Sequence, residues 1–338
     1  MIIQLPFVPR YPEQAEAVLG ILKGLPSYVQ PGVQIFRGPV DLHEQIPDDA
    51  LAEYVNKNVP AEFVRTLHAP ISDDNPDPRY SLMHPESEEM VLANLRVAER
   101  IGARSLTVHT NTVFTQGGRN PWTPKLDNYN TMAGRVRQPV YERLNLLARQ
   151  SGVLIGVENM PLPIRGDKKT DPTSLLYEPM MTSFEDLLDF CDNVRCAGIT
   201  YDTAHGELTR YSLNLLFKYL THPSDVRETY FRGIYPGHFG LQPSVKEQLF
   251  RLLGMGRVVD VQLQDARSSW LAYVSKAEEG MLLGDGDLGE DIFEIAREIN
   301  KHYGDVPVSI DVAEASKEEY ISRPRQRESL RRLLEAIK

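Results

Sequence analysis

Asp202 and His205 stand three residues apart in the stretch GITYDTAHGEL, residues 198–208. The apolar, β-branched residues before Asp202 predict a strand that ends at this carboxylate. Because α/β folds place chemistry in the loops after strands, a carboxylate and an imidazole here suit metal binding or proton transfer. A structural interpretation is equally open, with the aspartate as a helix N-cap and the histidine on the surface.

Polar residues end several other predicted strands. Together with Asp202, the strand-end set is His68, His109, Glu158, Gln262 and Asp311. A single strand-end histidine is more often structural than a ligand, but Glu158 in the apolar run LIGVENM would be a buried charge that needs a partner or a metal. Three converging carboxylates repel one another unless a divalent cation neutralises them. The set therefore predicts a metal site at one end of a sheet.

The elements that must position these residues alternate regularly along the chain. Strands are expected at 2–5, 33–36, 63–67, 105–108, 153–157, 197–201, 258–263 and 308–310. Helices are expected at 13–22, 48–55, 87–101, 138–149, 183–190, 245–253, 291–299 and 325–337. Eight strand-then-helix units predict a parallel sheet closed into a (β/α)8 TIM barrel. An open doubly wound sheet is the alternative, but no GxGxxG follows the first strand.

Composition limits the partners. The 338 residues carry no repeat or linker, so one domain over 1–338 is expected. Forty-seven acidic against 37 basic residues give a charge of -10, which favours a small-molecule partner over nucleic acid. Two cysteines fit a reducing cytoplasm, and no apolar stretch approaches the ~18 residues of a membrane span. We expect a soluble, cytoplasmic protein with no membrane partner.

Three connections exceed what a barrel needs, at 111–137, 160–182 and 206–242. All three follow strand ends, so in a barrel they rise on the catalytic face as loops around a pocket. The longest carries His238 among aromatic and glycine residues, and we expect it to close over the mouth. The alternative is that it forms a subunit interface.

The motifs TLHAP, TVHTN, GVENM, YDTAH, VQLQDA, GDGDLG and VSID occur in this order across residues 63–313. This ordered set resembles the xylose-isomerase-like TIM-barrel superfamily, which contains sugar isomerases, epimerases and the endonuclease IV family. The resemblance implies a shared divalent metal on Glu158, Asp202, Gln262 and Asp311, with His205 facing the substrate. It also implies a homo-oligomer, since the enzymes it resembles are often oligomers.

Two of these positions depart from the commonest pattern of the superfamily, because Gln262 replaces a usual histidine and Asp311 a usual glutamate. The resemblance to endonuclease IV implies a second ion, Zn2+, at His68, His109 and Glu158. The Asp-x-His expected for a third zinc is missing, since residues 276–280 read KAEEG. An amide in place of an imidazole suits Mn2+ or Mg2+ better than Zn2+.

The expected function is a divalent-metal-dependent isomerase or epimerase of a ketose or related hydroxy-carbonyl sugar. Glu158 and Asp311 would move the proton through an enediolate while His205 steadies the oxyanion. Expected substrate contacts are His68, His109, Arg267 and His238. The alternatives are an endonuclease IV-like phosphodiesterase, or AP endonuclease, and a non-catalytic barrel with a degenerate site.

Overall fold

The computed structural model describes residues 1–37, 46–70, 82, 85–110, 137–161, 180–219, 241–268, 278–316 and 319–338. Its centre is a closed barrel of parallel strands in the order β1-β10-β7-β6-β5-β4-β3-β2. The barrel strands are β1 (Ile2–Phe7), β2 (Gln30–Phe36), β3 (Val64–His68), β4 (Ser105–Val108), β5 (Leu154–Glu158), β6 (Gly198–Asp202), β7 (Val258–Leu263) and β10 (Pro307–Ile310). The predicted (β/α)8 TIM barrel is confirmed.

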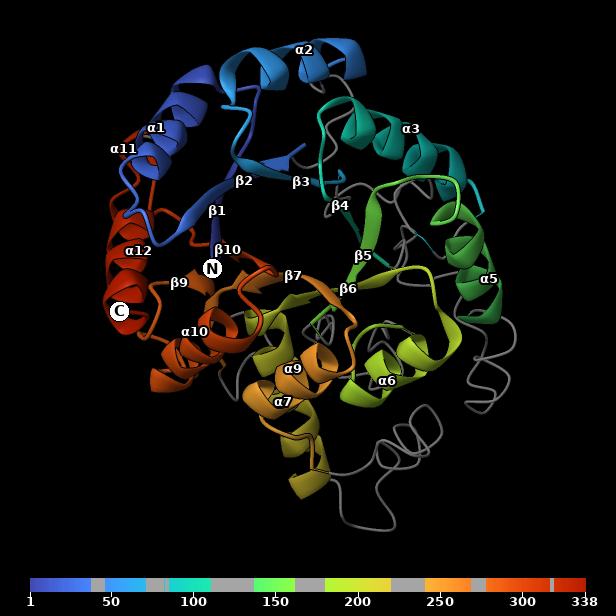
Figure 1. Ribbon diagram of the computed structural model, residues 1–338. Helices are drawn as coiled ribbons and strands as arrows, with labels where there is room; N and C mark the ends of the chain where they lie inside the picture. The colour runs from blue at the N-terminus through green and yellow to red at the C-terminus, as the bar shows by residue number, and fades with distance from the viewer. Residues whose placement is uncertain are drawn as a thin grey trace.

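Helices surround this barrel on its outer face (Figure 1). They are α1 (Pro12–Lys23), α2 (Asp48–Asn58), α3 (Ser87–Arg100), α5 (Gln138–Leu147), α6 (Phe184–Asn193), α7 (Thr203–Tyr219), α9 (Val245–Gly254), α10 (Glu290–His302), the short α11 (Glu319–Ser322) and α12 (Pro324–Ala336). In α10 the residues at helical spacing, Ile292, Ile295 and Ile299, are fully buried. Burying each such side chain stabilises the fold by about 1.5–3 kcal/mol, which holds the helix against the sheet.

The strand register brings the strand-end residues to one mouth. Asp202 pairs directly with Gln262 across β6 and β7, and Glu158 pairs with Thr200 across β5 and β6. Asp311 follows β10 and its main-chain N–H donates to the carbonyl of Leu263. Because all the barrel strands are parallel, these residues rise at the carboxyl ends together.

Two features differ from the predicted elements. The stretch from 206 was expected to be a long loop, which is wrong for its first part because α7 runs from Thr203 to Tyr219. The helix begins here because the carboxylate of Asp202 caps it, accepting the main-chain N–H of His205 at 2.9 Å. After β7 the chain also forms an unpredicted antiparallel hairpin, β8 (Asp265–Arg267) with β9 (Glu278–Met281).

The parts of the expected loops at 111–136, 162–179 and 220–240, which include His238, lie outside the described residues. The expectation that they cover the mouth stays a prediction. Within the described ranges, every helix is too short or too polar to cross a membrane.

Candidate metal centre

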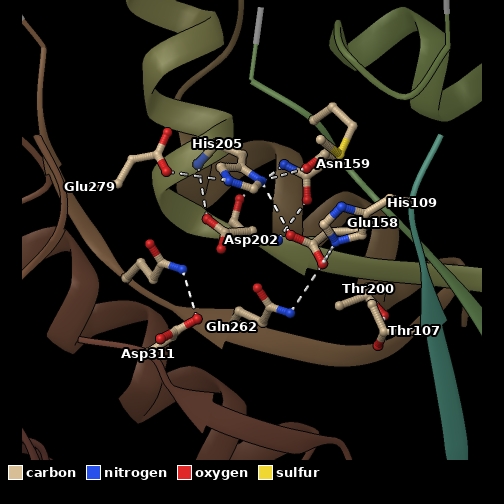
Figure 2. A network of polar contacts seen from close by, with 12 residues as sticks. Thr107, His109, Glu158, Asn159, Thr200, Asp202, His205, Gln262, Glu279 and Asp311 are labelled. Carbon is tan, nitrogen blue, oxygen red and sulfur yellow. Dashed lines mark hydrogen bonds and ion pairs between the residues drawn. The ribbon is translucent and has the colours of Figure 1, made fainter. Parts of the chain in front are cut away.

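Glu158, the last residue of β5, lies at the centre of the mouth and is 2% exposed. Its Oε2 is 3.1 Å from Nε2 of His68 and 2.9 Å from Nε2 of His109. These two imidazole nitrogens are 3.2 Å apart. Two rings from neighbouring strands therefore converge on one carboxylate oxygen, and Figure 2 shows His109 against Glu158.

His205 approaches the same carboxylate from the other side. Its Nδ1 is 3.3 Å from Oε1 of Glu158, and its Nε2 is 3.8 Å from Oε2 of Glu279. Figure 2 shows the ring between these two carboxylates. Glu158 thus uses one oxygen toward the two strand-end imidazoles and the other toward the first turn of α7.

Backbone contacts set the tautomers of two of these rings. Nδ1 lies 2.8 Å from a main-chain carbonyl oxygen in both cases, that of Ala69 for His68 and that of Asn159 for His205. When Nδ1–H is donated to such a carbonyl, Nε2 of a neutral ring is left as an acceptor, as in metal-bound histidines. At His68 this acceptor would face a carboxylate oxygen of Glu158, so either the ring is protonated or a cation lies between the two atoms.

Asp202 is the helix N-cap that one interpretation of the sequence expected, but His205 is buried rather than on the surface. The Oδ1 atom of Asp202 caps α7, whereas its Oδ2 is buried and has no hydrogen-bond partner among the described residues. The neighbouring Asn159 fixes the strand end, accepting the Asp202 N–H at 2.6 Å and donating to the Asp202 carbonyl at 2.9 Å. A buried carboxylate oxygen without a donor is a costly arrangement that a bound cation would relieve.

The two departures from the superfamily pattern occupy different positions. Gln262 reaches the centre, with its Nε2 3.2 Å from Oε2 of Glu158. Asp311 is held apart by Gln264, whose Nε2 donates to its Oδ2 at 3.1 Å. The amide therefore touches the shared carboxylate, and the shorter acid stands at the edge of the group (Figure 2).

Burial and neighbouring charges push the acid groups in opposite directions. Burial alone would raise the pKa of Glu158, but the charges and hydrogen bonds of His109 and His68 outweigh it and hold the pKa well below its usual range. For Asp202, burial dominates and raises the pKa to about 7. Burial, and then the charge of Glu158, also raise the pKa of Asp311. These carboxyls thus resist being ionised together.

Donor atoms within 4.8 Å of one another form two groups among the described residues, and Glu158 belongs to both. One group is His68, His109 and Glu158, the set expected for a second ion. The other is Glu158, Asp202 and His205, where the resemblance implied Gln262 and Asp311 instead. All the members are buried, and their oxygen and imidazole donors suit a divalent transition metal.

The sequence did not indicate Glu279. It lies in the segment where the resemblance to endonuclease IV implies an Asp-x-His. Its hairpin is anchored by Asp265, whose buried carboxylate accepts the main-chain N–H groups of Gly284, Gly286 and Leu288. The turn GDGDLG therefore holds a carboxylate of its own chain, and a Cβ at Gly286 would lie 2.2 Å from Asp265 Oδ1. The turn fixes the hairpin and with it the position of Glu279.

Arg267, an expected substrate contact, lies on the exposed side of the same hairpin. Its Nη1 is 3.6 Å from Oε2 of Glu278, and its Nη2 is 3.4 Å from the main-chain oxygen of Asp285. The described structure thus separates Arg267 from the group around Glu158. Its contact with substrate stays a prediction.

A cavity of about 780 Å³ opens beside this centre. His68 and Asp311 form part of its wall. Other wall residues come from the segment after β1 and from α11 and its C-terminal end. Its volume lies within the range of small-molecule sites, roughly 300–1,000 Å³.

These features define a (β/α)8 barrel with a buried cluster of imidazoles and carboxylates at the carboxyl ends of its strands. The family model described as xylose isomerase-like TIM barrel matches residues 31–336, and the chain belongs to that family. No curated protein matches the sequence significantly.

Solved structures of similar fold include both sugar enzymes and nucleases. A D-tagatose 3-epimerase-like protein has a TM-score of 0.56 at 14% identity, covering 100% of this chain and 98% of its own. Endonuclease IV from Thermus thermophilus has a TM-score of 0.53 at 16% identity, covering 99% of this chain and 98% of its own. The 3-keto-D-glucoside 4-epimerase of E. coli has a TM-score of 0.52 at 10% identity, covering 98% of each chain. At these identities the likeness shows the fold alone.

Proposed function

We propose that this protein is a divalent-metal-dependent isomerase or epimerase of a hydroxy-carbonyl sugar. The observation that carries the proposal is the cavity of about 780 Å³ that shares His68 and Asp311 with the centre around Glu158. A cavity of this size suits a small molecule better than a nucleic acid duplex, as does the net charge of -10. Two of the structurally similar proteins are named as an epimerase or epimerase-like.

The residues that would hold the cation are Glu158 and Asp202, with Gln262 and His205 beside them. The orphaned Oδ2 of Asp202 is the observation that fits a cation here. When bound, such an ion neutralises the carboxylates and polarises a substrate carbonyl. The oxygen-rich group suits Mn2+ or Mg2+, whereas the group of His68 and His109 suits Zn2+.

The acid and base roles follow from two carboxyls whose environments differ. Glu158 is kept ionised by its imidazole neighbours, which hold its pKa low, so it can take the proton from the carbon between carbonyl and hydroxyl. Asp311, on the cavity wall, has a pKa raised by burial and can return a proton on another face. His205 would donate to the oxygen that becomes negative in the enediolate.

The test is solvent exchange at carbon. Metal-loaded protein is incubated with D-fructose or D-tagatose in D2O, and deuterium at the carbon beside the carbonyl is followed by NMR. We expect exchange in the wild type and in Asp305→Asn, whose side chain is 83% exposed, but not in Glu158→Gln, whereas Asp311→Asn should exchange deuterium without forming the epimer. Formation of the epimer by Asp311→Asn at the wild-type rate would remove Asp311 from the mechanism, and no exchange with any ketose would reject the proposal.

A phosphodiesterase is the second candidate, favoured by the group of His68, His109 and Glu158 and by Glu158 being shared between two groups. Two divalent ions held by these two groups would stabilise the attacking and leaving oxygens of a phosphoryl displacement. Cleavage of an abasic DNA duplex by protein containing two equivalents of Zn2+ would favour the phosphodiesterase over the isomerase or epimerase.

The non-catalytic alternative expects the acids to be paired with arginine or lysine. Among the described residues, none of the ion pairs joins Glu158, Asp202 or Asp311 to such a side chain. This supports a site built for a cation rather than a degenerate one.

A further inference from the structure

The cavity beside the metal centre has a second end, formed by the segment after β1 and by the connection between α11 and α12. Asp311 and His68 line the cavity on the side of the centre, while Tyr320 of α11 and Arg323, between α11 and α12, line its second end. A substrate whose carbonyl lies at the centre would therefore place its far end near Arg323. The side chains at this second end of the cavity decide which chemical group the far end of the substrate can have.

Arg323 is buried and makes no hydrogen bond or ion pair with a carboxylate among the described residues, where Glu314 and Asp311 act on it through their charge without contact. The residue is 4% exposed, and its Nε has no hydrogen-bond partner there. Its Nη1 donates at 2.7 Å to Oε1 of Gln326, a neutral amide, and its Cζ lies 5.9 Å from the centre of the Tyr320 ring. Buried guanidinium groups are normally paired with carboxylate or phosphate, because burying an unpaired charge is costly.

The backbone holds Arg323 in a conformation that costs energy. Its φ is 52° in the left-handed region, it precedes Pro324, and it occupies the N-cap position of α12. A neutral or short side chain would serve better at this position on local grounds. Glu314 accepts the main-chain N–H groups of Arg325 and Gln326, so it caps the helix in place of Arg323. The arginine is thus not needed as the cap.

The other charged groups on the cavity wall do not neutralise Arg323. Arg10 adds a second cation at the exposed edge, and Glu13 is an exposed carboxylate in the first turn of α1. Asp311 also lines the wall, but its side chain accepts a hydrogen bond from Gln264 rather than from Arg323. A buried, unpaired cation on a small-molecule cavity is suited to an anionic group of the ligand.

We propose that this end of the cavity binds an anionic group, carboxylate or phosphate, at the end of the substrate remote from the carbonyl, with Arg323 as its specificity-determining contact. The inference rests on the proposed sugar isomerase or epimerase function and names its substrate class as acidic or phosphorylated sugars. A guanidinium binds both anions through paired N–H donors, so the structure identifies their shared chemistry.

The test uses three ketoses that differ only at C6: D-fructose, D-fructuronate and D-fructose 6-phosphate. Their dissociation constants are measured by titration calorimetry on the metal-loaded full chain. We expect the wild type to bind at least one of the two anions about tenfold or more tightly than fructose. The preferred anion distinguishes carboxylate from phosphate. Equal affinity for the three sugars, or no binding of any, would overturn the proposal.

The variants separate a specific contact from a structural role. Arg323→Gln should lose the preference for the anion while its affinity for fructose is unchanged, and Arg323→Lys should keep part of the preference. Arg327→Gln, which removes the same charge from an exposed position of the same helix, should behave as wild type. An equal loss of affinity for fructose and for the anions in both Arg323 variants would contradict the proposal.

The two proposals fail differently. Anion preference through Arg323 without solvent exchange at carbon would keep the subsite and reject the isomerase. Exchange at carbon with no preference for an anion would keep the isomerase or epimerase and reject the subsite.

Discussion

The two halves of the barrel mouth share Glu158 but differ in how their polar groups are satisfied. In the half formed by β3, β4 and β5, His68 and His109 each contact the carboxylate directly. In the half formed by β6, β7 and β10, Asp202 has a buried oxygen without a donor among the described residues, and Asp311 accepts from a neutral amide. The imidazole half is therefore internally paired, and the carboxylate half is not.

This difference indicates where a cation would contribute most. Contacts with the two imidazoles can stabilise Glu158 without a metal, whereas nothing of opposite charge in the described structure contacts Asp202 through Oδ2. An ion next to Asp202 would relieve a burial cost that the imidazole half does not have. Substitutions can change one half of the mouth at a time, or Glu158, the residue that the halves share.

Glu158→Gln should have the largest effect, because it removes the charge common to both halves. We expect metal content to fall below about a tenth of wild type and solvent exchange at carbon to fall by roughly 10³-fold. Metal analysis and the NMR exchange rate measure these effects. Glu290→Gln, with a side chain 68% exposed on α10, is the matched control and should match wild type. Wild-type metal content in Glu158→Gln would contradict the role of Glu158 as a metal ligand shared by both halves.

Asp202→Asn should change the pH dependence of stability in metal-free protein. Burial raises the folded-state pKa of Asp202 to about 7, above its unfolded value, so the native state keeps the proton as pH rises from about 4 to 6 while the unfolded state loses it. Wild type should therefore lose roughly 1 kcal/mol per pH unit relative to Asp202→Asn over this window. Urea unfolding with EDTA measures this, and parallel curves for the two proteins would refute it.

Gln262→His transfers an imidazole to the carboxylate half. Since imidazole favours Zn2+ and amide oxygen favours Mn2+ or Mg2+, the ratio of the Zn2+ and Mn2+ dissociation constants should shift toward Zn2+ by about tenfold. Competitive metal titration measures the ratio. Gln150→His, at an exposed position, is the control. An unchanged ratio in Gln262→His would show that residue 262 does not reach the ion.

Glu279→Gln should have the smallest effect. Burial alone would lower the pKa of His205, but Asp202 and then Glu279 raise it, so removing the charge of Glu279 lowers the pKa of His205. The partner is 3.8 Å away and 45% exposed, so we expect only a small fall in the pKa of His205. NMR titration of His205 in metal-free protein measures the pKa. Glu278→Gln, the adjacent residue that faces Arg267, should leave it unchanged.

Local patterns were sufficient to predict the barrel. Each predicted strand and helix is present within a few residues of its expected ends, because apolar spacing follows burial against the sheet. Parallel closure then brings strand-end residues such as His68, Glu158 and Asp202 to one mouth. Their convergence follows from topology once the eight units are counted.

The residues that were missed depend on contacts between distant segments. Glu279 reaches His205 only because β8 and β9 pair as a hairpin, which is anchored by hydrogen bonds from the turn at 284–289 to Asp265 of β8. Arg323 is marked by its burial, its unpartnered Nε and its left-handed backbone, none of which a charge pattern shows. An arginine-rich segment such as 323–332 is typical of a solvated helix face, which describes Arg327 but not the buried Arg323.

The central claim is that the carboxylate half binds a divalent cation together with Glu158. The most direct test is an anomalous difference map from crystals soaked in Mn2+, and separately in Zn2+, with data at each metal's absorption edge. We predict a peak within coordination distance of Asp202 Oδ2 and of Glu158, with or without a second peak at His68 and His109. A peak at the imidazole group alone, or no peak in either soak, would contradict the claim.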